Sequence, residues 1–106
     1  METIHLTVID RNNETHIVDF PNEEGYSLME ILKSAEFPVE GICGGMALCA
    51  SCHIYIESDH ILNEMRQEEI LMLDSVFNTK STSRLACQIP WSEKLDQLVI
   101  RLAVIQ

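Results

Sequence analysis

The chain lacks any apolar run long enough to cross a bilayer, because charged residues interrupt its longest hydrophobic stretches. Its first residues, METIHLTVID, show neither the basic segment nor the apolar segment of a secretory signal. The sequence also has no internal repeat, linker or low-complexity tract. We therefore expect a cytoplasmic protein that does not bind membranes and whose cysteines meet a reducing environment.

Positive charge is scarce. The chain carries 7 Lys and Arg against 17 Asp and Glu, which gives a net charge of −10. Between Asn12 and Met65 the only base is Lys33. Such a charge excludes nucleic acid as a partner, because phosphates would be repelled, and it favours partners with basic patches.

The length of 106 residues suits one domain spanning 1–106, and a hydrophobic content of 46% is enough for a packed core. We expect a monomer.

Alternating or nearly continuous apolar residues predict strands at 4–10, 15–20, 53–58, 84–89 and 96–104. In the first of these strands, Ile4, Leu6 and Val8 share one face, and the first two strands are expected to form a hairpin.

Two segments have a helical pattern. Ser27 and Glu30 have the spacing of a capping box, which predicts a helix over 27–35, and Pro38 prevents its continuation. A second pattern runs from 61 to 77. The residues expected to face the core there are Leu62, Met65, Met72, Leu73, Val76 and Phe77. The order of elements indicates a small α+β domain and fits a β-grasp (ubiquitin-like) arrangement.

Four cysteines follow the spacing Cys43-x5-Cys49-x2-Cys52-x34-Cys87. A structural zinc site usually takes its thiolates from two short knuckles, and here only one C-x2-C pair exists. A thioredoxin-type dithiol would use Cys49 and Cys52 alone and would leave the other two unexplained. The spacing instead resembles the plant-type [2Fe–2S] pattern with one more residue in the first gap, and it favours that cluster with all four cysteines as ligands.

The composition of the cysteine loop supports the cluster. Gly44 and Gly45 have no side chains, so backbone N–H groups can approach the sulfurs. No charged residue lies between Gly41 and His53. All-cysteine ligation gives the cluster a charge of about −2, and about −3 when it is reduced. Adding an electron to an acidic protein is unfavourable, so we expect a negative reduction potential.

His53 directly follows the third cysteine. Rieske centres replace two cysteines by two histidines, and the other histidines of this chain have no matching spacing. We interpret His53 as a hydrogen-bonded strand residue beside the ligands, which ties the cluster loop to the rest of the fold.

The segments CGGMALCASCHIYIE, EEILMLD and SRLACQI resemble those of adrenodoxin-type [2Fe–2S] ferredoxins, and in particular of the bacterial members related to putidaredoxin. The resemblance extends over nearly the whole chain. It implies a β-grasp fold and a [2Fe–2S] cluster held by the four cysteines. It also implies an electron carrier that takes single electrons from an NAD(P)H-dependent flavoprotein reductase and passes them to a terminal acceptor.

The family docks its partners on an acidic helix between the third and fourth cysteines. Here Glu68, Glu69 and Asp74 fit that pattern, whereas Gln67 and Ile70 depart from it. Leu71 also departs, and on a helix it falls on the outer face near Asp74, so we expect an exposed apolar contact among acids. The alternative is that Leu71 lies under a loop.

Three functions fit these features of the sequence. An electron carrier for a cytochrome P450 monooxygenase is favoured, because the branch that serves iron–sulfur cluster assembly often has an extra cysteine in the loop where this chain has Met46 and Ala47. Electron donation to cluster assembly is the alternative. A zinc-stabilised interaction module is the third. We see no nucleophile–base pair and no phosphate-binding loop, so we do not expect an enzyme.

Overall fold

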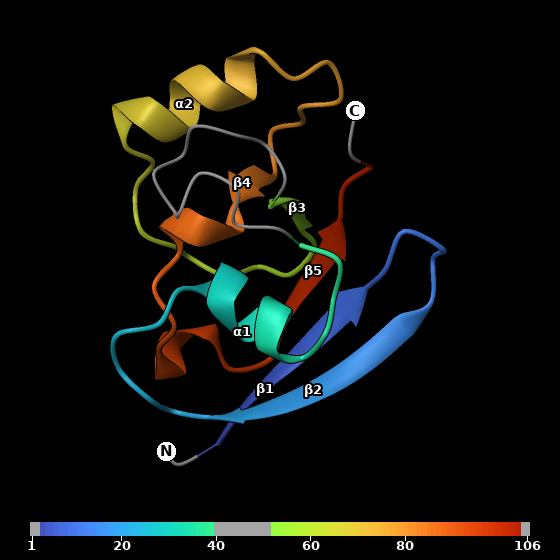
Figure 1. Cartoon of the computed structure of the whole chain (residues 1–106). Coiled ribbons are helices and arrows are strands. Elements are labelled where there is room, and N and C mark those ends of the chain that lie inside the picture. The colour runs from blue at the N-terminus through green and yellow to red at the C-terminus, as the bar shows by residue number, and fades with distance from the viewer. Residues whose placement is uncertain (1–2, 40–51, 105–106) are drawn as a thin grey trace.

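The computed structural model describes residues 3–39 and 52–104 (Figure 1). Within these ranges it has five strands, two α-helices and two short 3₁₀ helices. The strands are β1 (Thr3–Ile9), β2 (Thr15–Pro21), β3 (His53–Ile56), β4 (Ser83–Leu85) and β5 (Leu98–Leu102). The helices are α1 (Leu28–Ser34), α2 (Gln67–Asp74), η1 (Ala86–Gln88) and η2 (Glu93–Leu95).

The strands form one mixed sheet in the order β2-β1-β5-β3-β4. The first two strands make the expected antiparallel hairpin, and β5 lies parallel to β1 in the centre of the sheet. Strand β3 pairs antiparallel with both β5 and β4. Helix α1 crosses in front of the sheet, and α2 lies at its far end beyond β4 (Figure 1). This is the β-grasp arrangement that the sequence predicts.

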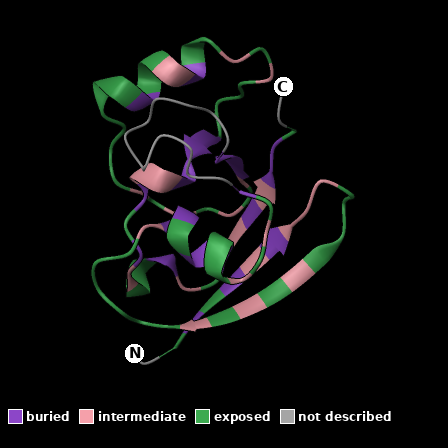
Figure 2. Ribbon diagram, viewed as in Figure 1, coloured by how far each residue is buried: buried purple, intermediate pink, exposed green. Residues whose placement is uncertain are grey.

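The core lies between α1 and the sheet. Ile4, Leu6 and Val8 alternate along β1 and are at most 1% exposed, as their spacing predicts. The inner stripe of α1 covers them, and Figure 2 shows buried residues on the facing sides of helix and sheet. The buried residues of this stripe are Leu28, Met29, Ile31 and Leu32.

The expected capping box begins α1. The backbone N–H of Glu30 donates to Ser27 Oγ at 3.3 Å, and the N–H of Ser27 donates to Glu30 Oε1 at 2.9 Å. At the other end Glu36 adopts a left-handed conformation (φ 67°), and the N–H of Phe37 reaches back to the carbonyl of Leu32. These two caps confine α1 to Leu28–Ser34.

Three predictions of local structure are corrected. The helical pattern of 61–77 yields a helix only from Gln67 to Asp74. Met65 (37% exposed) and Phe77 (79% exposed) point to the surface instead of the core. The strand predicted over 84–89 ends at Leu85, where the chain turns into η1.

Among the described residues, the helices are too short or too polar to cross a membrane.

Candidate metal centre

Two of the four cysteines, Cys52 and Cys87, lie within the described residues. Cys43 and Cys49, with Gly44 and Gly45, fall outside the described residues, so their predicted roles stay predictions. Cys52 is buried, directly before β3. Cys87 is half-buried in η1, directly after β4.

Strand pairing brings these two distant cysteines to the same place. His53 faces Leu85 across the β3–β4 pair. One step further along, the backbone N–H of Ala86 donates to the carbonyl of Cys52 at 3.0 Å. The residue before Cys87 is therefore hydrogen-bonded to Cys52, although 34 residues separate the two cysteines in sequence. This pairing explains how a remote fourth sulfur can join the sulfurs of the cysteine loop.

The donor set suits an iron–sulfur cluster. Thiolates are soft ligands, and Cys52 and Cys87, each next to one of two paired strands, can supply them. The loop that carries the other two has no charged side chain between Gly41 and His53 that could compete for the metal. The residues present therefore fit a [2Fe–2S] group.

His53 is the hydrogen-bonded strand histidine that the sequence predicts. Its ring is buried, and Nε2 lies 2.8 Å from Ser83 Oγ, which in turn accepts the N–H of Lys80 at 2.8 Å. Burial lowers the pKa of His53 below its usual value. Among the described residues, Nδ1 of His53 finds no hydrogen-bond partner. His53 thus links β3 to the turn before β4.

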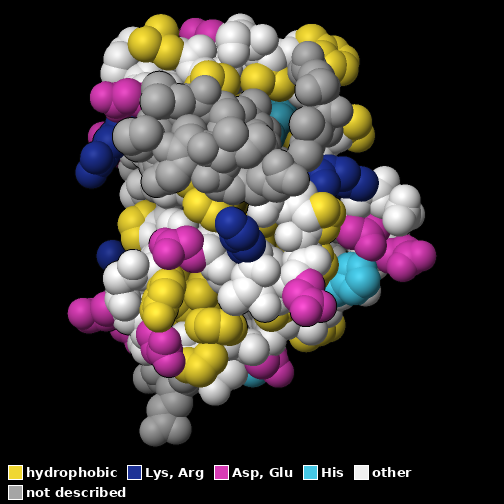
Figure 3. Space-filling model, in the orientation of Figure 1, with side chains coloured by type: hydrophobic (Ala, Val, Ile, Leu, Met, Phe, Trp, Pro, Cys, Tyr) yellow, Lys and Arg dark blue, Asp and Glu magenta, His cyan; other side chains and the backbone are white. Residues whose placement is uncertain are grey.

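Helix α2 presents Glu68, Leu71 and Asp74 to solvent, and Leu71 is 58% exposed. The exposure expected for Leu71 is confirmed. Figure 3 shows hydrophobic and acidic side chains together on the surface over α2. Beside the helix lies a hollow of about 470 Å³ lined by Met65, Ile70, Leu73, Asp74, Thr79, Lys80, Ser81 and Ser83.

Glu69 does not belong to this surface, and its predicted docking role is wrong. Its side chain is 0% exposed and forms a bidentate ion pair with Arg84 on β4, at 2.7 and 3.1 Å. The same carboxylate accepts the backbone N–H of Leu85 at 2.9 Å. Glu69 therefore joins α2 to the strand that leads to Cys87.

Arg84 was not predicted from the sequence, although one signal for it was present. Leu73 was assigned to the core, and Glu69 lies four residues earlier on the same helical face. A carboxylate at a core-facing position needs a cationic partner, because an unpaired buried charge is costly. Arg84 begins a segment predicted to be a short strand and otherwise free of charged residues.

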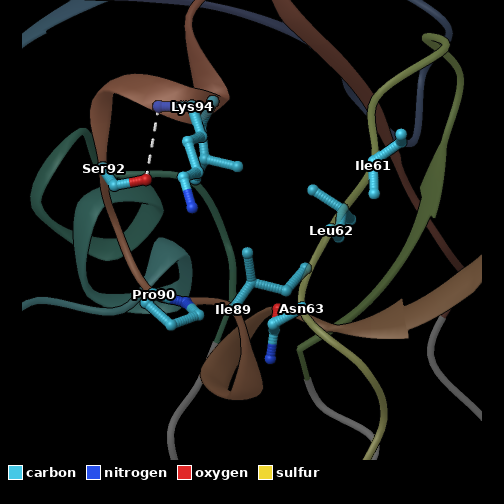
Figure 4. A pocket seen from close by; sticks show the side chains of 8 residues that line it. Ile61, Leu62, Asn63, Ile89, Pro90, Ser92 and Lys94 are labelled. Carbon is cyan, nitrogen blue, oxygen red and sulfur yellow. Dashed lines mark hydrogen bonds between the residues drawn. The ribbon is translucent and has the colours of Figure 1, made fainter.

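A second hollow lies away from α2, between residues 61–63 and the segment from Ile89 to Leu95 (Figure 4). Ile61, 96% exposed, stands on one side, and Pro90 and Lys94 stand on the other. Of the described residues that line it, Lys94 alone carries a charge. Most of the residues that line it are apolar.

Comparison with known proteins agrees with this geometry. Residues 9–92 match the model of the 2Fe-2S iron-sulfur cluster binding domain. A 2Fe-2S ferredoxin of Rickettsia bellii is 39% identical over 95% of this chain and 91% of its own length. The mitochondrial adrenodoxin homolog of Saccharomyces cerevisiae is 35% identical over 74% of this chain and 47% of its own length.

Solved structures of putidaredoxin are similar in fold to this chain. Reduced putidaredoxin from Pseudomonas putida, as a variant, superposes with a TM-score of 0.83 at 31% identity, covering 96% of this chain and 98% of that one. The covalent complex of putidaredoxin reductase and putidaredoxin contains a chain with a TM-score of 0.79 at 32% identity, covering 92% of this chain and 96% of that one.

Proposed function

Because the chain belongs to the 2Fe-2S ferredoxins of the adrenodoxin and putidaredoxin type, which carry electrons on a [2Fe–2S] cluster, we propose that it accepts single electrons from an NAD(P)H-dependent flavoprotein reductase. It delivers them to a terminal acceptor such as a cytochrome P450 monooxygenase. It has no substrate of its own.

Cys43, Cys49, Cys52 and Cys87 are the proposed ligands. The cluster supplies one-electron redox chemistry when it is bound. The chain holds two of the sulfurs directly beside the paired strands β3 and β4, Cys52 before β3 and Cys87 in η1, and the half-buried position of Cys87 keeps one of them close to the surface. The test is Cys87→Ser, which should abolish or strongly destabilise the cluster. An unchanged visible spectrum would show that the fourth ligand is another residue.

The docking surface comprises Glu68, Leu71 and Asp74 on the outer face of α2. This proposal rests on the exposed leucine, which lies between exposed acids on α2. The inner face of the same helix is bound to β4 through Glu69. A hydrophobic contact surrounded by charges is typical of transient interfaces. A reductase as partner is supported by the covalent complex of putidaredoxin with its reductase. In that complex the putidaredoxin chain is the one that is 32% identical to this chain.

The docking proposal is tested by Leu71→Asp. We expect the rate of reduction by a flavoprotein reductase to fall about tenfold or more, since central apolar residues dominate interface energies, while the cluster spectrum stays intact. The matched control is Ile17→Asp, because Ile17 is 70% exposed on β2, at the other edge of the sheet. Equal rates for the two variants would contradict the proposal.

The terminal acceptor is tested separately. Reduced protein is mixed with a cytochrome P450 or with cluster-assembly machinery, and the rate of oxidation is followed. Faster oxidation by the assembly machinery would assign the chain to the alternative function.

A further inference from the structure

The side-chain amide of Gln88 lies beside the sulfur of Cys87. Gln88 Nε2 is 3.4 Å from Cys87 Sγ, which is within hydrogen-bonding distance for sulfur, and both residues are half-buried and lie in η1. A primary amide nitrogen only donates hydrogen bonds, so the contact has one direction, from nitrogen to sulfur.

Gln88 is held in place by a chain of polar contacts. Asn63 Nδ2 donates to the backbone carbonyl of Gln88 at 2.9 Å. The guanidinium of Arg84 donates to Asn63, from Nη1 to the backbone carbonyl at 2.9 Å and from Nη2 to Oδ1 at 3.4 Å. Arg84 is itself fixed by buried Glu69. The backbone that positions the amide is therefore bound to both α2 and β4.

We propose that Gln88 sets the reduction potential of the cluster by donating a hydrogen bond to the thiolate of Cys87. Reduction adds one electron, and with it one negative charge, to the cluster and its ligands. A fixed N–H donor stabilises the more negative state more strongly. Gln88 thus raises the potential and offsets part of the cost of adding an electron to an acidic protein.

Other features of the chain make this donor effective. The cysteine loop carries no charged side chain between Gly41 and His53, so hydrogen bonds have less competition from local charges in setting the potential. Gln88 is neutral, so its effect acts through a directed dipole and should change little with salt. The inference rests on the proposed ligation by Cys87 and is independent of the choice of partners.

The test is the midpoint potential of holoprotein carrying Gln88→Met, measured by spectroelectrochemical titration. Methionine matches the length of glutamine and cannot donate. At a fixed solution potential we expect the ratio of reduced to oxidised protein to fall about three- to tenfold, which is the range for loss of one ordinary hydrogen bond. Tenfold corresponds to about 59 mV for a one-electron couple. An unchanged potential would overturn the proposal.

Two further variants separate this role from a structural one. Gln67→Met makes the same change at an exposed position on α2 and should leave the potential unaltered. Gln88→Asn keeps the amide but withdraws it by one methylene, so it should lower the potential as Gln88→Met does. Failure of both Gln88 variants to hold a cluster would assign Gln88 a structural role and overturn the proposal. Cys87→Ser tests the ligation itself.

Discussion

Glu69 and Arg84 form a buried ion pair between α2 and β4, and their side chains are 0% and 8% exposed. The carboxylate accepts from Arg84 twice and from the backbone N–H of Leu85 once. A buried pair of this kind adds little net stability compared with apolar residues, but removing one partner leaves an uncompensated charge. Its main effect is to fix how the outer helix sits relative to the strand that leads to Cys87.

Glu69→Gln should therefore lower the free energy of unfolding by about 3–5 kcal/mol, because Arg84 stays buried without a counter-charge. Denaturant titration followed by circular dichroism measures this change. The control is Glu68→Gln at the exposed neighbouring position, where a change within about 0.5 kcal/mol is expected. Similar losses in both variants would mean that Glu69 is not buried as described.

His5 and Asp19 form a second pair, across the β1–β2 hairpin at the surface, with Nδ1 2.6 Å from Oδ1. This hydrogen bond raises the pKa of His5 above its ordinary value of 6.5. A histidine with a raised pKa in the folded state adds stability that is fully present below the unfolded pKa and is lost as the pH rises through the folded pKa.

The difference in melting temperature between the protein and its His5→Gln variant should thus be largest below pH 6.5 and should shrink at higher pH. Thermal unfolding across that range provides the measurement. Asp19→Asn should remove most of the same pH-dependent difference. A difference that grows with pH would contradict the assignment.

At the scale of elements, α1 depends on its capping box. Replacing Ser27 by alanine removes the acceptor for the N–H of Glu30. We expect a loss of about 1 kcal/mol, which lowers the melting temperature by about 4–8 °C in a domain of this size. Ser81→Ala, in an exposed loop, is the matched control and should change little. Equal effects would show that the cap is not formed.

The sequence predicts elements well where side-chain periodicity and packing agree. The alternation in β1 and the apolar stripe of α1 lead to the observed hairpin, helix and buried faces. The resemblance to adrenodoxin-type ferredoxins supplies the topology, which periodicity alone leaves open. Of the metal centre, the spacing of the cysteines predicts the cluster type, and strand pairing adds how Cys87 comes near Cys52.

The ends of α2 were not predictable from the local pattern because tertiary contacts determine them. A helix running through 61–66 would use the carbonyl of Asn63 internally, but Arg84 takes that carbonyl at 2.9 Å. At the other end, Thr79 Oγ1 donates to the carbonyl of Leu73 at 2.6 Å and Ser75 Oγ donates to that of Met72 at 2.7 Å. Side chains thereby satisfy the last helical carbonyls and allow the helix to stop at Asp74.

At the scale of the whole molecule, the net charge of −10 creates a field that attracts and orients basic partners. The exposed acids of α2 contribute to that field at the proposed docking surface. Attraction between complementary surfaces raises association rates at low ionic strength and is screened by salt. The contribution of the acids on α2 to the association rate can be separated from that of the net charge. The same charge change is made once on α2 and once at a site away from α2.

Glu68→Lys should slow electron transfer from the reductase at low ionic strength, and the deficit should decrease as salt is added. Stopped-flow reduction at several salt concentrations measures it. Glu23→Lys changes the net charge equally in an exposed loop after β2 and should have a smaller effect. Identical salt profiles for the two variants would show that net charge, rather than α2, controls docking.

Every role described above depends on this chain binding a [2Fe–2S] cluster and carrying one electron at a time. The most direct test is metal and sulfide analysis of freshly isolated protein, combined with a reductive titration of its visible spectrum. We expect two irons and two acid-labile sulfides per chain and a reddish-brown absorption that bleaches on uptake of one electron. One zinc per chain, no sulfide and no colour would contradict it.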